Sequence, residues 1–213
     1  GVLVMQRDFG PALIILVVGL LWARSAGIPR RYVTCAALGI GTVGLFVVHS
    51  YPHLSRRIVA WLTPWWDPFG TGYQSLQARF AMAHGHVSGH GWHESFTRVP
   101  AVATDLPLVG LVERLGLLGG LVLLLLFAGT VAVMLRAAWS RHDHVERHIG
   151  IGCALLLGVE AFLAGSGAVG LTPLIGITLP FVSYGGSSLL AGFLLLALAH
   201  TWARPQERTN LAV

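Results

Sequence analysis

The chain has 213 residues, of which 54% are hydrophobic and only 11% are charged. An ordinary soluble domain has about 25% charged residues, so this composition argues against a soluble protein and favours one that crosses a membrane several times. The formal charge of +5 comes entirely from arginine, and the aromatic residues lie mostly in or beside apolar runs, which does not suggest a base-stacking surface. We therefore expect a membrane protein without a nucleic-acid partner.

Five apolar segments follow one another along the chain. They cover approximately residues 9–27, 32–51, 106–135, 149–169 and 187–203. Each is close to the roughly 20 residues that a helix needs to span the hydrocarbon core of a bilayer. The sequence therefore predicts an all-α integral membrane protein of about five transmembrane helices, with residues 1–213 forming a single membrane domain.

The arginines predict the orientation of these helices. Arginine groups at 24–31, 136–147 and 204–208 follow the first, third and fifth segments, so they share one side of the membrane if the helices alternate. The positive-inside rule makes that side cytoplasmic. The long loop of residues 52–105 and the connection after residue 169 then face outward. Loops this long cross the membrane largely regardless of charge, which accommodates the four arginines of this loop: Arg56, Arg57, Arg79 and Arg98.

The outward loop contains two local patterns. Residues 56–66 mix apolar and aromatic side chains and suit the membrane interface, where tryptophan is favoured. Residues 73–84 predict a short amphipathic helix with Leu76, Phe80 and Ala83 on one face, and the glycines that follow would end it.

Four histidines crowd the glycine-rich stretch after this predicted helix: His84, His86, His90 and His93. Imidazoles at such spacing can bind zinc. No cysteine lies nearby, and Glu94 is the only carboxylate among them. We therefore interpret the stretch as a loop with incidental histidines and predict no metal site.

The stretch between the last two apolar segments cannot continue either of them as a regular helix. Its prolines lack a backbone donor, and its glycines permit conformations that other residues avoid. Most of its other residues are apolar. Irregular backbone is tolerated at membrane depth only where protein or a water-filled cavity covers it, so we expect a re-entrant or tightly packed loop, with a plain connector as the alternative. The punctuating residues are Pro173, Gly176, Pro180, Gly185 and Gly186.

Asp105 is the residue that we expect to carry chemistry. It directly precedes the third apolar segment, where a carboxylate can act as a general base. The alternative is a helix cap, because Asp is favoured at the N-cap and Pro107 favours a helix start at this point. Asp8 precedes the first segment and allows two similar interpretations, a polar anchor in a cavity or an N-cap.

Glu160 lies inside the fourth apolar segment. An ionisable group at that depth costs about 2.5–3.5 kcal/mol on insertion scales and marks a functional site by default. A neutral, hydrogen-bonded packing residue is the alternative interpretation.

The stretch SYGGSS at residues 183–188 combines hydroxyl groups with flexible backbone. Its hydroxyls and its glycine amides form a nest-like arrangement that can bind a sugar or a diphosphate. Ser187 alternatively caps the fifth helix. Ser183 has no local His or Asp partner, so we do not expect a serine nucleophile.

The residues from Gly170 to Ser188 resemble the C-terminal signature of the SEDS family, the RodA/FtsW group of cell-wall polymerases. The family pattern reads approximately Gly-x-x-Pro-x-x-Gly-(Ile/Leu)-x-Leu-Pro-(Phe/Leu)-(Val/Ile)-Ser-Tyr-Gly-Gly-Ser-Ser, and each specified position matches here. Residues 67–74, DPFGTGYQ, are similar to its Asp-Pro-x-Gly-x-Gly-Tyr-Gln, and residues 6–10, QRDFG, to its Gln-Pro-Asp-Leu-Gly. The pattern around the family's proposed catalytic carboxylate is matched at Pro100, Thr104, Asp105, Glu113 and Gly116.

The resemblance implies a peptidoglycan glycosyltransferase that polymerises lipid II into glycan strands during elongation or division. Asp105 would deprotonate the sugar hydroxyl of the acceptor, which attacks the anomeric carbon of the donor glycan while undecaprenyl diphosphate leaves. The resemblance also implies a divalent cation such as Mg²⁺ at the diphosphate, a class B penicillin-binding protein as partner, and a place in the cytoplasmic membrane. The substrate-binding residues that it suggests are Asp8, Tyr73, Gln74, Glu113, Ser183, Tyr184, Gly185, Gly186 and Ser187.

The chain departs from the family pattern at several polar positions. Ala101 and Ala103 stand where the family has Glu and His, Arg114 where it has a second Glu, and Ala164 where it has Asn. Three hypotheses follow: a divergent polymerase, a catalytically degenerate scaffold of a cell-wall synthesis complex, or a lipid II transporter (flippase) that uses polar residues such as Glu160. A full-length SEDS protein has further spans, so the chain resembles its C-terminal half.

Overall fold

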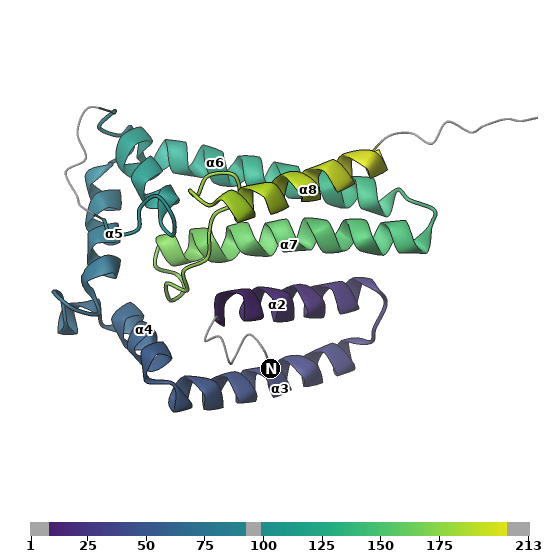
Figure 1. Cartoon of the computed structure of the whole chain (residues 1–213), viewed down its shortest axis with the longest axis horizontal. Coiled ribbons are helices and arrows are strands. Elements are labelled where there is room, and N and C mark those ends of the chain that lie inside the picture. Colours follow the sequence, from purple (N-terminus) through teal and green to yellow (C-terminus); the bar gives the residue numbers. More distant parts are fainter. Residues whose placement is uncertain (1–8, 93–98, 204–213) are drawn as a thin grey trace, which may run out of the picture.

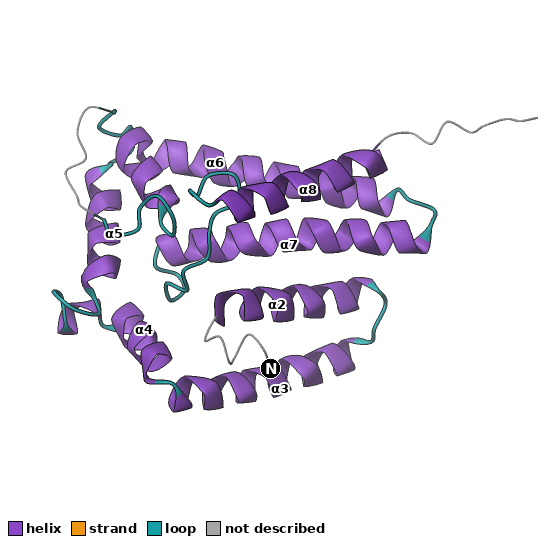
Figure 2. Ribbon diagram, viewed as in Figure 1, coloured by secondary structure: helices purple, strands orange, loops and turns teal. Residues whose placement is uncertain are grey.

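The computed structural model describes residues 9–92 and 99–203. Throughout these ranges the regular structure is helical and no β-strand occurs (Figure 2). The predicted all-α class is therefore confirmed. The physical reason is that a helix satisfies the backbone groups of a long apolar run within the run itself.

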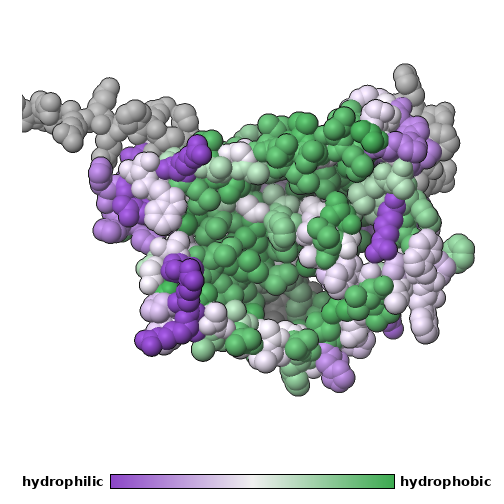
Figure 3. Space-filling model, turned by 180° about the vertical axis from the view of Figure 1, so that it is seen from behind, coloured by the Kyte–Doolittle hydropathy of each residue, from purple (hydrophilic) through white to green (hydrophobic). Residues whose placement is uncertain are grey.

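Five apolar helices correspond to the five predicted segments, and they run side by side in Figure 1. α3, α6 and α7 are long and apolar enough to cross a membrane, whereas α2 and α8 are shorter apolar helices. On the face shown in Figure 3, a belt of hydrophobic side chains lies between two more polar ends. The chain is thus a multi-pass membrane protein. The helices are α2 (Phe9–Ser25), α3 (Arg30–Ser50), α6 (Pro107–Trp139), α7 (His144–Ala168) and α8 (Gly186–Ala203).

The bundle core forms where α2, α6 and α8 pack against α7. Small residues on α7 make this packing possible, because alanine and glycine let neighbouring helices approach closely. Ala154, Ala161 and Ala168 are buried there, and so is Ala164, which replaces a polar residue of the SEDS pattern. α3 differs, because it has no buried residue and packs mainly on α2 and on α4 (Pro52–Leu62).

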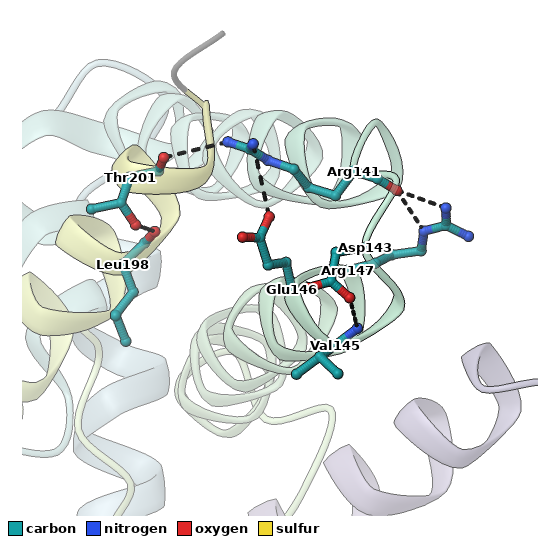
Figure 4. Close-up of polar contacts among 7 residues, drawn as sticks. All are labelled: Arg141, Asp143, Val145, Glu146, Arg147, Leu198 and Thr201. Atoms are coloured by element: carbon teal, nitrogen blue, oxygen red, sulfur yellow. Dashed lines mark hydrogen bonds and ion pairs between the residues drawn. The ribbon is translucent and has the colours of Figure 1, made fainter. Parts of the chain in front are cut away.

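Side chains of residues 141–147 hold the α6–α7 turn, and one of them also reaches α8 (Figure 4). Asp143 caps α7 by accepting a hydrogen bond of 2.9 Å from a backbone amide in its first turn. The Arg147 guanidinium donates to the Arg141 carbonyl at 2.6 Å. Arg141 itself lies 3.8 Å from the Glu146 carboxylate and donates to the Thr201 carbonyl of α8 at 3.3 Å.

The C-terminal ends of α2, α6 and α8 lie on the same side of the bundle, as alternating spans require. α2 ends beside the beginning of α7, where the Trp22 indole donates to the His148 carbonyl at 2.9 Å. Figure 1 shows these ends on one side of the bundle and the segment between α3 and α6 on the other. The predicted alternation is confirmed, and the assignment of sides to cytoplasm and exterior stays a prediction. Arg204 and Arg208 lie outside the described residues.

Three short helices build the opposite end of the bundle: α4, the 3₁₀ helix η1 (Pro64–Trp66) and α5 (Tyr73–His84). The sequence predicted an interfacial segment at residues 56–66 but not that it belongs largely to a helix. That helix begins at Pro52, where proline suits the first helical position because its missing N–H would have no partner there.

α5 has the predicted bounds but buries a different face. Its buried residues are Leu76, Ala78 and Ala81, so the predicted face is wrong at Phe80 and Ala83. The two buried alanines allow α5 to lie close to α6. The Phe80 ring is 46% exposed and packs edge-on against a tryptophan of η1.

α6 is interrupted at Gly116, which has φ 74° and ψ 179°. The predicted span is confirmed, and the sequence did not predict this break. A broken helix needs other polar groups to satisfy the freed backbone, and residues 85–91 supply them. The amides of Leu117 and Leu118 donate to the carbonyls of His86 and Val87, and the amides of His90 and Gly91 donate to those of Glu113 and Arg114, at 2.9–3.3 Å.

The connection between α7 and α8 turns back into the bundle. It leaves α7 after Ala168, yet the Thr178 hydroxyl donates to Glu160 Oε1 at 3.4 Å. Glu160 lies about two helical turns, or 12 Å, below the end of α7. α8 begins at a similar depth, because Ser188 Oγ in its first turn lies 3.1 Å from Thr178 Oγ1. The predicted re-entrant geometry is confirmed, and residues 169–185 are called the re-entrant loop below.

Candidate active site

Asp105 is held in a compact turn that ends directly before α6. The carbonyl of Ala101 accepts hydrogen bonds from the amides of Thr104, Asp105 and Leu106 at 3.2, 2.9 and 3.2 Å. α6 then begins at Pro107, its N-cap is Leu106, and no side chain caps it. The alternative interpretation of Asp105 as an N-cap is therefore wrong. The carboxylate is half-buried and is not occupied in capping the helix.

A polar pocket of about 190 Å³ lies in front of Asp105. Its walls come from α4, from the turn before α5, from α5 and from the re-entrant loop. Gly176 of that loop stands so close that a Cβ there would lie 3.5 Å from Asp105 Oδ2. The lining residues that carry polar side chains are Arg56, Arg57, Thr71, Gln74, Ser75 and Asp105.

The two arginines of this pocket have different surroundings. Arg57 donates to the carbonyls of Ile175 and Leu174 at 2.8 and 3.4 Å, so it fastens the re-entrant loop to α4. Arg56 is exposed and makes no ion pair or side-chain hydrogen bond with any residue that the structure describes. In the sequence, both stand out only as exceptions to the positive-inside rule. That exception was itself the available signal, because an arginine on the predicted outer side is available to bind an anion.

The DPFGTGYQ stretch contributes one residue of its Tyr–Gln pair to the pocket. Asp67 closes the turn by accepting from the Thr71 amide at 2.8 Å. Gly72 is required there, because a Cβ would collide with the Pro64 carbonyl. Tyr73 begins α5 and does not line the pocket. Gln74 does line it, and its side chain donates to the Pro100 carbonyl at 3.4 Å, beside the turn that carries Asp105.

Most of the other predicted substrate-binding residues line a second, separate hollow of about 690 Å³ between α6 and α8. Its rim carries Trp92 and Arg114, with the guanidinium 4.9 Å above the indole ring. Ser187 lines neither space. The predicted residues that do line this second hollow are Glu113, Ser183, Tyr184, Gly185 and Gly186.

Ser183 and Tyr184 connect the second hollow to the Asp105 turn. The Ser183 hydroxyl accepts from the buried Leu179 amide at 2.7 Å, which closes the return arm of the re-entrant loop. The Tyr184 amide donates to the Ala103 carbonyl at 2.7 Å, while its ring is 83% exposed. The turn at residues 101–106 therefore lies between the two hollows. The alternative of a Ser187 cap is not found, because α8 begins one residue earlier at Gly186.

Two predictions involve residues outside the described ranges. Asp8 is one of these residues, and His93 of the histidine cluster is the other. His84 and His90 stack at 4.2 Å between ring centroids, and His86 lies 5.5 Å from His90. Within the described ranges, no three His, Cys, Asp or Glu side chains are arranged to hold a metal ion.

Comparison with known proteins identifies similar chains. The profile of the cell cycle protein family that covers FtsW, RodA and SpoVE matches residues 1–207. The chain is 37% identical over 197 residues to a probable peptidoglycan glycosyltransferase FtsW of Geobacter sp. (strain M18), covering 89% of this chain and 53% of that protein. It is 34% identical over 199 residues to the peptidoglycan glycosyltransferase RodA of Mycobacterium bovis, covering 93% of this chain and 42% of that one.

A solved structure has the same arrangement of helices. It comes from work described as "Structural coordination of polymerization and crosslinking by a peptidoglycan synthase complex". It aligns with a TM-score of 0.74 and 26% identity, over 97% of this chain and 59% of the other. The chain thus spans about half the length of the curated relatives it matches.

Proposed function

The chain belongs to the SEDS family of FtsW, RodA and SpoVE cell cycle proteins, and from this premise we propose that it is the C-terminal half of a peptidoglycan glycosyltransferase. The proposed reaction polymerises lipid II at the outer face of the cytoplasmic membrane. The observation that carries this proposal is the pocket at the end of the bundle that Asp105 and Arg56 both line. The names of the relatives support the reaction class.

Asp105 is the proposed general base. In this role its carboxylate takes the proton from the acceptor sugar hydroxyl while the oxygen attacks the anomeric carbon of the donor. Such a base must come within about 2.6–3.2 Å of the hydroxyl, directly or through one water. The turn built on the Ala101 carbonyl holds the Asp105 backbone in place before substrate arrives, which lowers the cost of reaching that geometry.

Arg56 is the proposed contact for the leaving diphosphate. Negative charge develops on this group as the glycosidic bond breaks, and a positioned cation stabilises it most where water is partly excluded. A guanidinium also forms paired hydrogen bonds with phosphate oxygens. Arg57 adds positive charge to the same pocket, although its hydrogen bonds are directed at the re-entrant loop.

A divalent cation at this site would depend on the substrate. Mg²⁺ is usually held by one or two carboxylates together with phosphate oxygens and water. Among the described residues, Asp105 is the one carboxylate that lines the pocket, so the diphosphate itself would supply most ligands. The chemistry that such an ion supplies is neutralisation of the leaving group.

The arrangement in the membrane follows from the positions of the charges. We propose that the basic α6–α7 turn faces the cytoplasm and that residues 52–105 face outward. A class B penicillin-binding protein is the proposed partner that crosslinks the product. The description of the similar solved structure, which joins polymerisation to crosslinking in one complex, supports this partnership.

The test is polymerisation of lipid II in liposomes by this chain assembled with its N-terminal half, a penicillin-binding partner and Mg²⁺. We expect glycan strands, and a loss of at least about 10²-fold in Asp105→Asn. Asp143→Asn is the matched control, because that carboxylate caps α7 at the far end of the bundle and asparagine caps equally well. Equal activity of both variants would reject Asp105 as the base. A folded assembly without any product would favour the scaffold or the transporter.

A further inference from the structure

Glu160 takes part in a polar contact deep inside the bundle that the proposed reaction does not use. Its Oε1 accepts from the Thr178 hydroxyl at 3.4 Å, and the same hydroxyl lies 3.1 Å from Ser188 Oγ. These three side chains come from α7, from the lowest part of the re-entrant loop and from α8. Polar groups at such depth keep the partners they find, because the surrounding bilayer offers no others.

Thr178 lies on a stretch of the loop that is firmly packed. Its neighbours Ile177 and Leu179 are 7% and 1% exposed and belong to the core. Because both neighbours of Thr178 are packed in the core, the backbone here moves as one unit. A displacement at Thr178 is therefore passed on to the residues before it. Gly176, two residues earlier, forms the wall of the pocket next to the Asp105 carboxylate.

The loop is therefore held by two polar anchors on opposite sides of Gly176. Arg57 holds the carbonyls of residues 174 and 175 from the outer end. Glu160 holds residue 178 from within the bundle. Removing either anchor leaves the wall of the pocket with a polar anchor on one side only.

We propose that Glu160 is a positioning residue, which acts through Thr178 to keep Gly176 against Asp105. Its effect on reaction rate rests on the proposed function, whereas its effect on the loop does not. The contact needs an acceptor oxygen at residue 160 and a hydroxyl donor at residue 178. A glutamine at residue 160 also offers an acceptor oxygen, and serine at residue 178 also offers a hydroxyl.

The first experiment measures hydrogen exchange of the re-entrant loop in the full chain in detergent. We expect Glu160→Leu and Thr178→Val to speed exchange across residues 174–183 by about threefold to tenfold, as for the loss of one hydrogen bond. Glu160→Gln and Thr178→Ser should exchange as the parent does. Thr130→Val is the matched control, because that hydroxyl bonds within α6, to the Leu126 carbonyl.

The second experiment measures polymerisation kinetics in the assembled enzyme. We expect Glu160→Leu to lower kcat several-fold with little change in the KM for lipid II, because Asp105 is misplaced while Arg56 remains. Adding Thr178→Val should lower kcat little further, since both changes remove the Glu160–Thr178 contact and the second change removes in addition only the bond to Ser188 Oγ. Rescue by Glu160→Gln separates positioning from a need for charge.

Failure of the Glu160 proposal can be told apart from failure of the proposed function. Unchanged loop exchange in Glu160→Leu overturns the anchor, whether or not the protein polymerises lipid II. Faster exchange with unchanged kcat overturns the positioning role. A Glu160→Gln variant as impaired as Glu160→Leu also overturns it. If the parent protein makes no glycan, the proposed function fails and the exchange measurement still decides the anchor.

Discussion

The two connections of α7 satisfy their backbone groups in different ways. The α6–α7 turn uses neighbours in the sequence, because Asp143 caps the helix and Arg147 holds the carbonyl six residues before it. The re-entrant loop uses distant partners: Arg57 is 118 residues from Ile175, and Trp61, whose indole donates to the Gly170 carbonyl at 2.8 Å, is 109 residues away from it. A turn near water needs little help, whereas backbone within the bundle needs protein partners. Substitutions at positions far away in the sequence should therefore destabilise the re-entrant loop more than they destabilise the turn.

Of the substitutions that test this comparison, Gly176→Val in the re-entrant loop should have the largest effect on stability and activity. Gly176 has φ 76°, a conformation that β-branched residues rarely adopt, and the added side chain would press on Asp105. We expect a loss of about 2 kcal/mol or more in the free energy of unfolding, together with loss of polymerisation. The measurement is thermal melting in detergent alongside glycan synthesis. Gly129→Val is the control, because a Cβ at Gly129 of α6 meets open space, and equal melting of the two variants would contradict the described loop.

Arg57→Gln and Arg56→Gln should separate anchoring from anion binding. Arg57→Gln removes the charge-assisted donor to the Ile175 carbonyl, so we expect about 0.5–1.5 kcal/mol lower stability for this exposed hydrogen bond. Arg56→Gln should leave stability within about 0.5 kcal/mol and weaken lipid II polymerisation. Melting curves and initial rates of both variants provide the check. Identical behaviour would show that the two arginines share one role.

Ser183→Ala tests the closure of the loop within its own return arm. The buried Leu179 amide would lose its hydroxyl acceptor, which costs about 1–3 kcal/mol when no other partner is available. We expect a lower melting temperature, with Ser187→Ala as the control because that side chain is exposed. A melting temperature equal to that of the control would mean that another group replaces the Ser183 hydroxyl.

Asp143→Ala should have the smallest effect, since it concerns the locally held turn. Loss of a side-chain N-cap costs about 1 kcal/mol, and asparagine at the same place should cost almost nothing. Neither variant is expected to change polymerisation, because the pocket lies at the other end of the bundle. A loss of activity in Asp143→Ala without a matching loss of stability would show that the turn is coupled to the site.

The site shows where sequence reasoning succeeds and where it stops. Asp105 was predicted because a family pattern and a position before a helix both point to it; the structure places it in the wall of a polar pocket, and its catalytic role stays a prediction. Arg56 was missed as a site residue, because its place in the pocket depends on how α4 folds back over the re-entrant loop. The predicted substrate-binding residues looked like one set in the sequence, but the fold divides them between two hollows on either side of the turn at residues 101–106.

The five apolar helices and the bounds of α5 were determined by the sequence alone, because the length of an apolar run and its punctuation by glycine and proline are local properties. The tertiary structure alone decided three other features: the break of α6 at Gly116, the buried alanine face of α5, and the depth reached by Thr178. Each depends on backbone and side chains that are distant in the chain meeting at close range. No local pattern specifies which distant partner will satisfy a freed carbonyl or leave room for a helix to approach.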